Sequence, residues 1–136
     1  MASFNVSSTE IPVLILSKTL KSTAAEGAVV CFGTDYDEVA LPGAGPVQIG
    51  VAGILRQAGV SGDRASILVL GVANVLALAT TTVTEGVPVI IANTSGHVKS
   101  WTNETNVDVV GISMVTRTIG ATAELIPVLM GVYRKS

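Results

Sequence analysis

The sequence predicts an all-β domain, either a barrel or a sandwich. Short runs rich in Val, Ile and Leu alternate with turns rich in Gly, Pro and Asn, a pattern typical of many short strands. Little of the chain has the pattern of a helix, and chains with many short strands and few helices fold as barrels or sandwiches. A set of features marked by glycine occurs twice, which indicates two similar halves.

The repeated features are three glycines that each adjoin an apolar run. They are Gly27, Gly50 and Gly71 in the first half, and Gly86, Gly111 and Gly131 in the second. The offsets between the pairs are 59, 61 and 60 residues. We therefore expect two pseudo-symmetric halves, residues 27–72 and 86–132, within one domain of residues 27–136. Chance agreement in a chain rich in Val, Ile and Gly is the alternative.

Residues 1–26 lie outside the repeat and are expected to form an extended N-terminal arm. The arm begins polar, continues as the strand-like run Ile11–Ser17 and ends in the polar segment Lys18–Glu26. The two halves do not need this segment, so it is free to pair with a neighbour or a partner. The alternative is a first strand of the core with a frayed tip.

Eight further strands are expected in chain order. They are Gly27–Phe32, Val39–Leu41, Val47–Ala52, Ala65–Val72, Gly86–Ala92, His97–Trp101, Asp108–Thr116 and Glu124–Tyr133. The first strand of each half is a β-branched run, and the loop Pro42–Pro46 joins fixed φ angles to permissive glycines. If the apolar run after Arg64 continues as a strand to Ala79, it needs a bend near Gly71.

The composition favours a protein that associates with itself. Charged residues make up 13% of the chain, about half of the usual ~25%, while the hydrophobic fraction of 49% is ordinary. Interface cores are depleted in charge, so a neutral surface suits subunit contacts. Ile54, Leu55 and Trp101 are the candidate residues of that oligomer interface. A monomer with a surface rich in Thr, Ser and Gly is the alternative.

Two partner classes are disfavoured by the charge and hydropathy patterns. The net charge is −2 and the chain has no basic patch, whereas nucleic-acid binding needs several phosphate contacts. Ala65–Thr84 lacks charges, but its apolar centre, Ile67–Ala79, is too short to span a membrane.

The single cysteine, Cys31, lies in an apolar run and is expected to be a buried structural thiol.

No catalytic, cofactor or metal motif stands out. His97 is the only histidine and follows a turn signal directly, which favours a surface role over that of a catalytic base. Asp35, Asp37 and Glu38 are spaced like ligands of a calcium loop, but the rest of such a loop is missing. A solvated acidic turn is the preferred interpretation. An enzyme that uses Asp35, Asp37 or Asp63 as acid or base is the remaining alternative.

Several segments resemble the small capsid-decoration proteins of tailed bacteriophages, also called cement or head-stabilising proteins. The resemblance rests on Gly27–Val30, Pro46–Ala52, the turn Ser61–Asp63 and Val109–Ser113, and it covers roughly Glu26–Val132. It implies a small β-barrel or β-tulip-like domain without a catalytic site. It also implies a homotrimer.

The resemblance further implies a structural virion protein, made in the host cytoplasm and bound to the outer surface of an icosahedral capsid. Its partner would be the major capsid protein, and it would stabilise the expanded shell by bridging capsid subunits. The arm would reach the capsid through an added strand. Its candidate capsid-binding residues are Phe4, Val6, Ile11, Val13 and Ile15. A fibre, tail or shell-assembly module without a cementing role is the alternative.

Overall fold

The computed structural model describes residues 10–33, 35, 37–43 and 50–135. These residues form strands and no helix, which confirms the all-β fold class. None of them, therefore, belongs to a helix long and apolar enough to cross a membrane. The strands are β1 (Ile11–Leu20), β2 (Val29–Phe32), β3 (Glu38–Ala40), β4 (Val51–Leu55), β5 (Arg64–Ala77), β6 (Thr82–Val83), β7 (Pro88–Ile91), β8 (Val98–Ser100), β9 (Val107–Ser113), β10 (Arg117–Thr118) and β11 (Glu124–Lys135).

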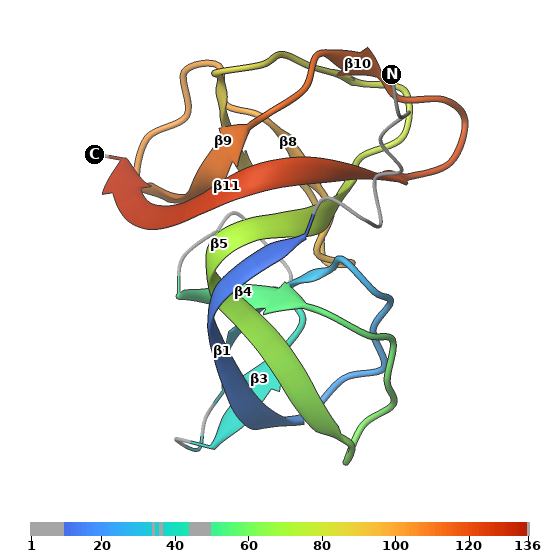
Figure 1. The fold of residues 1–136 in the computed structure, drawn as a ribbon, viewed down its shortest axis with the longest axis vertical. Coiled ribbons are helices and arrows are strands. Elements are labelled where there is room, and N and C mark those ends of the chain that lie inside the picture. The colour runs from blue at the N-terminus through green and yellow to red at the C-terminus, as the bar shows by residue number, and fades with distance from the viewer. Residues whose placement is uncertain (1–9, 34, 36, 44–49, 136) are drawn as a thin grey trace.

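The large sheet closes on itself twice, and the two closed parts share β5. The strand order is β1-β3-β2-β4-β5-β11-β9-β7-β8, with additional pairings of β1 with β5 and of β5 with β8. Ring one therefore consists of β1, β3, β2, β4 and β5, and ring two of β5, β11, β9, β7 and β8. Figure 1 shows ring one below ring two, with β5 running through both.

The two rings follow the same strand plan. In ring one, β1 is antiparallel to β5 and parallel to β3. In ring two, β5 is antiparallel to β11 and parallel to β8, so its second part takes the place that β1 takes in ring one. This corrects the expectation of a free arm for residues 11–20, which form a strand of ring one. Phe4 and Val6 lie outside the described residues.

One pair of repeated glycines is shifted relative to the sequence alignment. Gly53 lies opposite Val30 on β2, and Gly111 lies opposite Val89 on β7. The counterpart of Gly111 is therefore Gly53 and not Gly50. Both glycines lie against the backbone carbonyl of a long strand, where a side chain would collide, so this close approach explains the repeated residue.

The buried side chains form two large clusters on either side of β4. Ile54 belongs to the cluster that fills ring two and the junction, and Leu55 belongs to the cluster inside ring one. Each of these two side chains is 1% exposed. Since both are enclosed by their own chain, they are not available to a neighbouring subunit, which corrects their assignment to an oligomer interface.

The long strand β5 runs from Arg64 to Ala77 and passes from one ring to the other at Gly71. Gly71 has a φ of 117°, a conformation that favours glycine. Its α-carbon lies directly against the carbonyl of Ile11 on β1. The expected bend near Gly71 is therefore present, and it is also the point at which the start of β1 is attached.

Candidate interaction surface

A row of apolar side chains crosses five neighbouring strands. Cross-strand partners place their side chains on the same face of a sheet. The register links the members in the order Pro88, Ile112, Leu129, Val72 and Ile11, on β7, β9, β11, β5 and β1. We call these five residues the apolar row. With neighbouring strands about 4.8 Å apart, four spacings give the row a length of roughly 19 Å.

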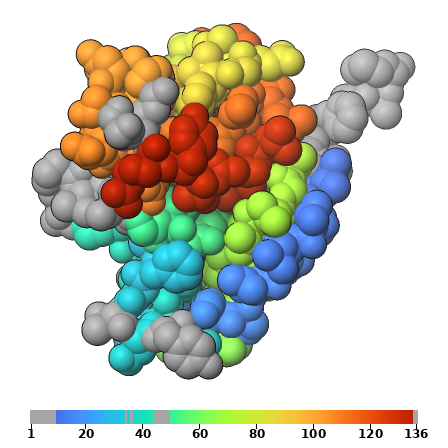
Figure 2. Space-filling view, turned by 90° about the vertical axis from the view of Figure 1, so that its left-hand side faces the viewer, coloured from blue at the N-terminus to red at the C-terminus, as the bar shows by residue number. Residues whose placement is uncertain are grey.

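Three members of the apolar row are exposed to solvent. Ile11 is 61% exposed, Leu129 is 49% exposed and Ile112 is 38% exposed, while Val72 is buried between its neighbours. Figure 2 shows β11, β5 and β1 side by side at the molecular surface, in red, green and blue. None of the five residues is charged, and contiguous exposed apolar surface is typical of a site of protein contact.

The N-terminal half of β1, residues Ile11–Ile15, is apolar and exposed on both faces. Every residue in it is exposed, and Val13 reaches 72%. Alternating burial is the norm for a strand on a core, so this segment is attached mainly through its edge on β5. The structure thus places three of the predicted capsid-binding residues at the surface: Ile11, which belongs to the apolar row, and Val13 and Ile15, which follow it on β1.

An ion pair anchors the start of β1. The Glu10 carboxylate accepts hydrogen bonds from Nη2 of Arg56 at 2.8 Å and from Nε of Arg56 at 3.2 and 3.3 Å. Nη1 of the same guanidinium donates to the Ser66 hydroxyl at 3.1 Å. Arg56 directly follows β4 and Ser66 lies on β5, so the pair connects the residue before β1 to these two strands.

A second arginine anchors the C-terminal half of β1. Arg64 donates to the Ser17 hydroxyl and carbonyl and to the Thr19 hydroxyl, and it also pairs with Asp37. The hydrogen bond from Arg64 holds the pKa of Asp37 below its usual value. Leu20, at the end of β1, is fully buried. The two halves of β1 therefore differ, because only the second half contributes a side chain to the core.

Trp101, the third predicted interface residue, is half-buried in ring two. Its indole Nε1–H donates to the Glu104 carbonyl at 2.7 Å. Its ring packs against a small cluster of Ile90, Val107 and Val109. The indole is therefore fixed by its own loop, and part of it remains at the surface.

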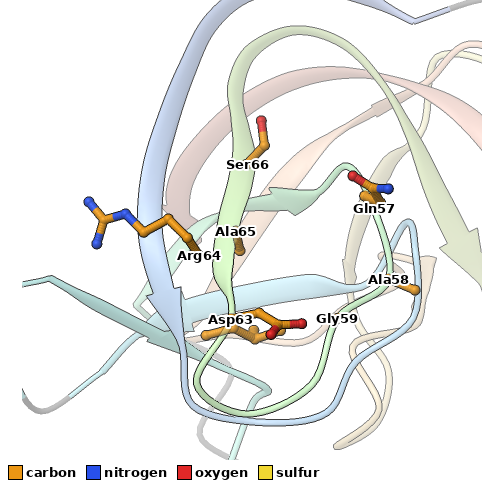
Figure 3. Close-up of a pocket in the computed structure, with 8 residues that line it drawn as sticks. Gln57, Ala58, Gly59, Asp63, Arg64, Ala65 and Ser66 are labelled. Carbon is orange, nitrogen blue, oxygen red and sulfur yellow. The ribbon is translucent and has the colours of Figure 1, made fainter.

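A pocket of about 350 Å³ lies at the lower end of ring one, apart from the apolar row. It is lined by Leu20, Gln57, Ala58, Gly59, Asp63, Arg64, Ala65 and Ser66. Figure 3 shows the Arg64 side chain pointing away from the other labelled residues, toward β1. Asp63 accepts the Val60 N–H at 2.9 Å. Both charged side chains of the pocket are therefore engaged with neighbouring residues.

The acidic turn and the histidine also have local partners. Glu38 pairs with Lys21 at 3.3 Å. The His97 Nδ1 lies 3.2 Å from the Asn93 amide nitrogen, and burial lowers the pKa of His97. Within the part of the chain that the structure describes, no group of three His, Cys, Asp or Glu residues is placed to hold a metal ion.

Sequence reasoning missed the exposed residues Leu129 and Ile112 of the apolar row. Their strands are almost entirely apolar, so the sequence does not show which face is covered. The signal that was available is the excess of apolar residues at consecutive positions in β9 and β11, because a strand at the surface needs them on only one face. Strand register alone brings these residues next to Ile11.

No family model matches the sequence, and no curated protein matches it. Among solved structures, the chain is similar to the N base of the head fiber gp8.5 of bacteriophage phi29. The TM-score is 0.61 at 14% identity, over 87% of this chain and 93% of that chain. The likeness is one of fold. It covers both rings of the molecule and not one half alone.

Proposed function

We propose that this chain is a structural protein of a bacteriophage virion. The observation that carries the proposal is the fold, which is similar over nearly the whole chain to the base of a phage head fiber. The resemblance of Gly27–Val30 and Val109–Ser113 to capsid-decoration proteins supports the same assignment independently, because it rests on sequence. Both lines of support lead to proteins of the phage head.

Within the virion, we propose that the chain binds the outer surface of the capsid and bridges capsid subunits. The apolar row and Ile11–Ile15 are the proposed contact surface, since they are uncharged and exposed. A protein that binds only the assembled shell stabilises it by mass action, by about 2.7 kcal/mol per site at a hundredfold excess over Kd. Summed over the many equivalent sites of a shell, such contacts resist internal pressure. We also propose a homotrimer.

The edge of β1 favours contact through side chains over an added strand. The Ile11 carbonyl and the Val13 N–H face Gly71 on β5, so the backbone of Pro12 faces away from β5. Proline has no N–H to donate at that edge, and the register of β1 shifts twice between Pro12 and Ile15. Proline, irregular register and an edge lysine such as Lys18 are devices that protect edge strands from pairing.

A second candidate function is a fibre base or assembly module that does not cement the shell. The fold similarity to a head fiber base favours this alternative directly. The two functions differ in one property. A cement protein raises the temperature at which empty expanded shells disrupt, whereas a fibre base attaches without changing it or associates only with itself.

The test is co-sedimentation of the purified chain with expanded capsid shells of the phage that encodes it. The informative variant is Leu129→Asp, which places a charge in the apolar row. The matched control is Val60→Asp, because Val60 is 55% exposed and lies in the turn before β5, outside the row. Shell disruption by heating is followed in the same samples, and light scattering gives the oligomeric state.

We expect the wild-type chain and Val60→Asp to bind and to raise the disruption temperature. Leu129→Asp should bind at least tenfold more weakly, because its carboxylate has to lose its water in the interface. Binding that leaves the disruption temperature unchanged would favour the fibre-base alternative. A wild-type chain that stays in the supernatant at high concentration would refute the cementing function, and a monomer in light scattering would then refute the fibre-base alternative as well.

A further inference from the structure

The N-terminal half of β1 is the part of the proposed contact surface with the weakest attachment to the core. Ile11, Val13, Leu14 and Ile15 are all at least 40% exposed, so burial of these side chains contributes little to holding the strand. Segments with few buried contacts open locally at low free-energy cost. The attachment of this half therefore depends on its ladder with β5 and on whatever fixes its first residue.

The Glu10–Arg56 ion pair fixes the residue directly before Ile11. Its side chains are only 22% and 30% exposed, and the guanidinium bonds both carboxylate oxygens. Charge-assisted bonds of this kind are stronger than neutral ones, and the planar guanidinium also sets the geometry. The Ser66 hydroxyl holds the guanidinium from its other side. Exposed ion pairs contribute little, but this one is partly enclosed and all three guanidinium nitrogens donate hydrogen bonds.

We propose that the Glu10–Arg56 pair holds residues Ile11–Ile15 in the docked position on β5, and that this docked strand is the form that binds the partner surface. In this proposal Arg56 does not touch the capsid and acts only by holding Glu10, so it is a positioning residue. Only the second part of this proposal, that the docked strand is the binding form, rests on the proposed function. Docking places Ile11 beside Val72 and so completes the apolar row across β1.

The expected effect on binding follows from the docked population. When only a fraction of the molecules is competent, the apparent Kd rises by the inverse of that fraction. Loss of the pair should therefore weaken shell binding by the factor by which it depletes the docked form. The folded core should change little, since Leu20 and the Arg64 contacts still hold the second half of β1.

The experiment compares hydrogen exchange and shell binding in matched variants of the full chain. Arg56→Gln and Glu10→Gln each remove one side of the pair. The double variant Glu10→Arg with Arg56→Glu reverses it. Lys99→Gln is the control, since it removes the Lys99–Glu104 pair in ring two and leaves β1 untouched. The readouts are the protection of the amides of residues 13–16, the midpoint of unfolding and the affinity for empty shells.

We expect protection of residues 13–16 to fall about tenfold in both single variants and to recover in the reversed pair. The free energy of unfolding should fall by no more than the ~1.4 kcal/mol that a tenfold change represents. Shell affinity should follow the docked fraction that the exchange gives for each variant, and it should recover in the reversed pair. Unchanged protection in both single variants would overturn the positioning role. Lost protection with full shell affinity would show that the docked strand is not the binding form. If the wild-type chain does not bind shells, the proposed function and the claim that the docked strand binds are both wrong. Hydrogen exchange would still test whether the Glu10–Arg56 pair holds the strand on β5.

Discussion

Gly53 and Gly111 occupy equivalent positions in the two rings, each against the carbonyl of a long strand. A Cβ on Gly53 would lie 2.5 Å from the Leu68 carbonyl oxygen and 2.7 Å from Cγ2 of Ile67. On Gly111 it would meet the Leu129 carbonyl oxygen in the same way. Backbone carbonyls cannot move aside without breaking the ladder, so both positions require glycine.

We predict that Gly53→Ala and Gly111→Ala each lower the free energy of unfolding by about 1–3 kcal/mol, the usual range for overpacking. Gly131→Ala is the control, because no atom lies within 4 Å of the added Cβ. Denaturant unfolding measures all three. A wild-type midpoint for either of the first two variants would contradict the close contact.

Cys31 carries an unreactive thiol. Burial, with a smaller effect from the nearby Asp108 carboxylate, raises the pKa of Cys31 from 9.0 to about 11. The thiolate is the reactive form, so at pH 8 a rise of this size reduces it about a hundredfold. We predict that a thiol reagent labels the native chain about two orders of magnitude more slowly than the denatured chain. Comparable rates would show that the thiol is open to solvent.

Glu104 organises the loop that carries Trp101. The Thr102 N–H, together with the Asn103 N–H and the Thr102 hydroxyl, lowers the pKa of Glu104 from 4.5 to about 2. A lowered pKa in the folded state means that the carboxylate stabilises the loop above pH 4.5. That contribution is lost as the pH falls toward 2.

We predict a change in Trp101 fluorescence between pH 4.5 and pH 2. Trp101 is the only tryptophan in the chain, so the signal is specific to this loop. Glu104→Gln should show the acid-type spectrum already at pH 7, and Glu85→Gln, in another turn, should behave as wild type. A pH-independent spectrum in the wild-type chain would contradict the role of the carboxylate.

At the scale of elements, the sequence predicts the strands well and their partners poorly. Local patterns placed the strands around Val29–Phe32, Pro88–Ile91 and Glu124–Tyr133 and the bend at Gly71, because turns and β-branched runs act locally. The pairing of β1 with β5 joins residues about 50 positions apart and leaves no local mark. Residues 11–20 were therefore expected to be a free arm.

The same limit explains the wrong assignment of Ile54 and Leu55. They follow each other on β4, which is buried on both faces because it lies at the junction of the rings. A continuous apolar run does not reveal whether its second face meets solvent, a partner or a second core. For the interaction surface, the sequence predicted Ile11, Val13 and Ile15 as capsid-binding residues; the structure shows that they are exposed, and their contact with a capsid stays a prediction. Leu129 and Ile112 join them only through register.

The sharing of β5 couples the two rings. A strand common to both cannot lose its partners in one ring without affecting the other, so we predict a single unfolding transition. The chain provides a probe on each side, since Cys31 lies on β2 in ring one and Trp101 lies between β8 and β9 in ring two. Cys31 labelling and Trp101 fluorescence should give the same denaturant midpoint. Separate midpoints would show that the rings fold independently.

At the scale of the whole molecule, many charged side chains pair within the chain. Among the residues that the structure describes, Lys21, Arg56, Arg64, Lys99 and Arg134 each form an ion pair with a carboxylate. The proposed contact surface carries no charge. We therefore predict that shell affinity changes less than threefold between 50 and 500 mM NaCl, because screening acts on charges. A steep loss of affinity with salt would indicate an ionic interface elsewhere on the molecule.

The most direct test of the account is an electron cryo-microscopy reconstruction of expanded shells saturated with the chain. The account predicts density on the outer surface, with each copy turned so that the apolar row and Ile11–Ile15 meet the capsid subunits. The Leu129→Asp variant should leave the shells bare under the same conditions. Density in which another face meets the shell, or shells that stay bare with the wild-type chain, would contradict it.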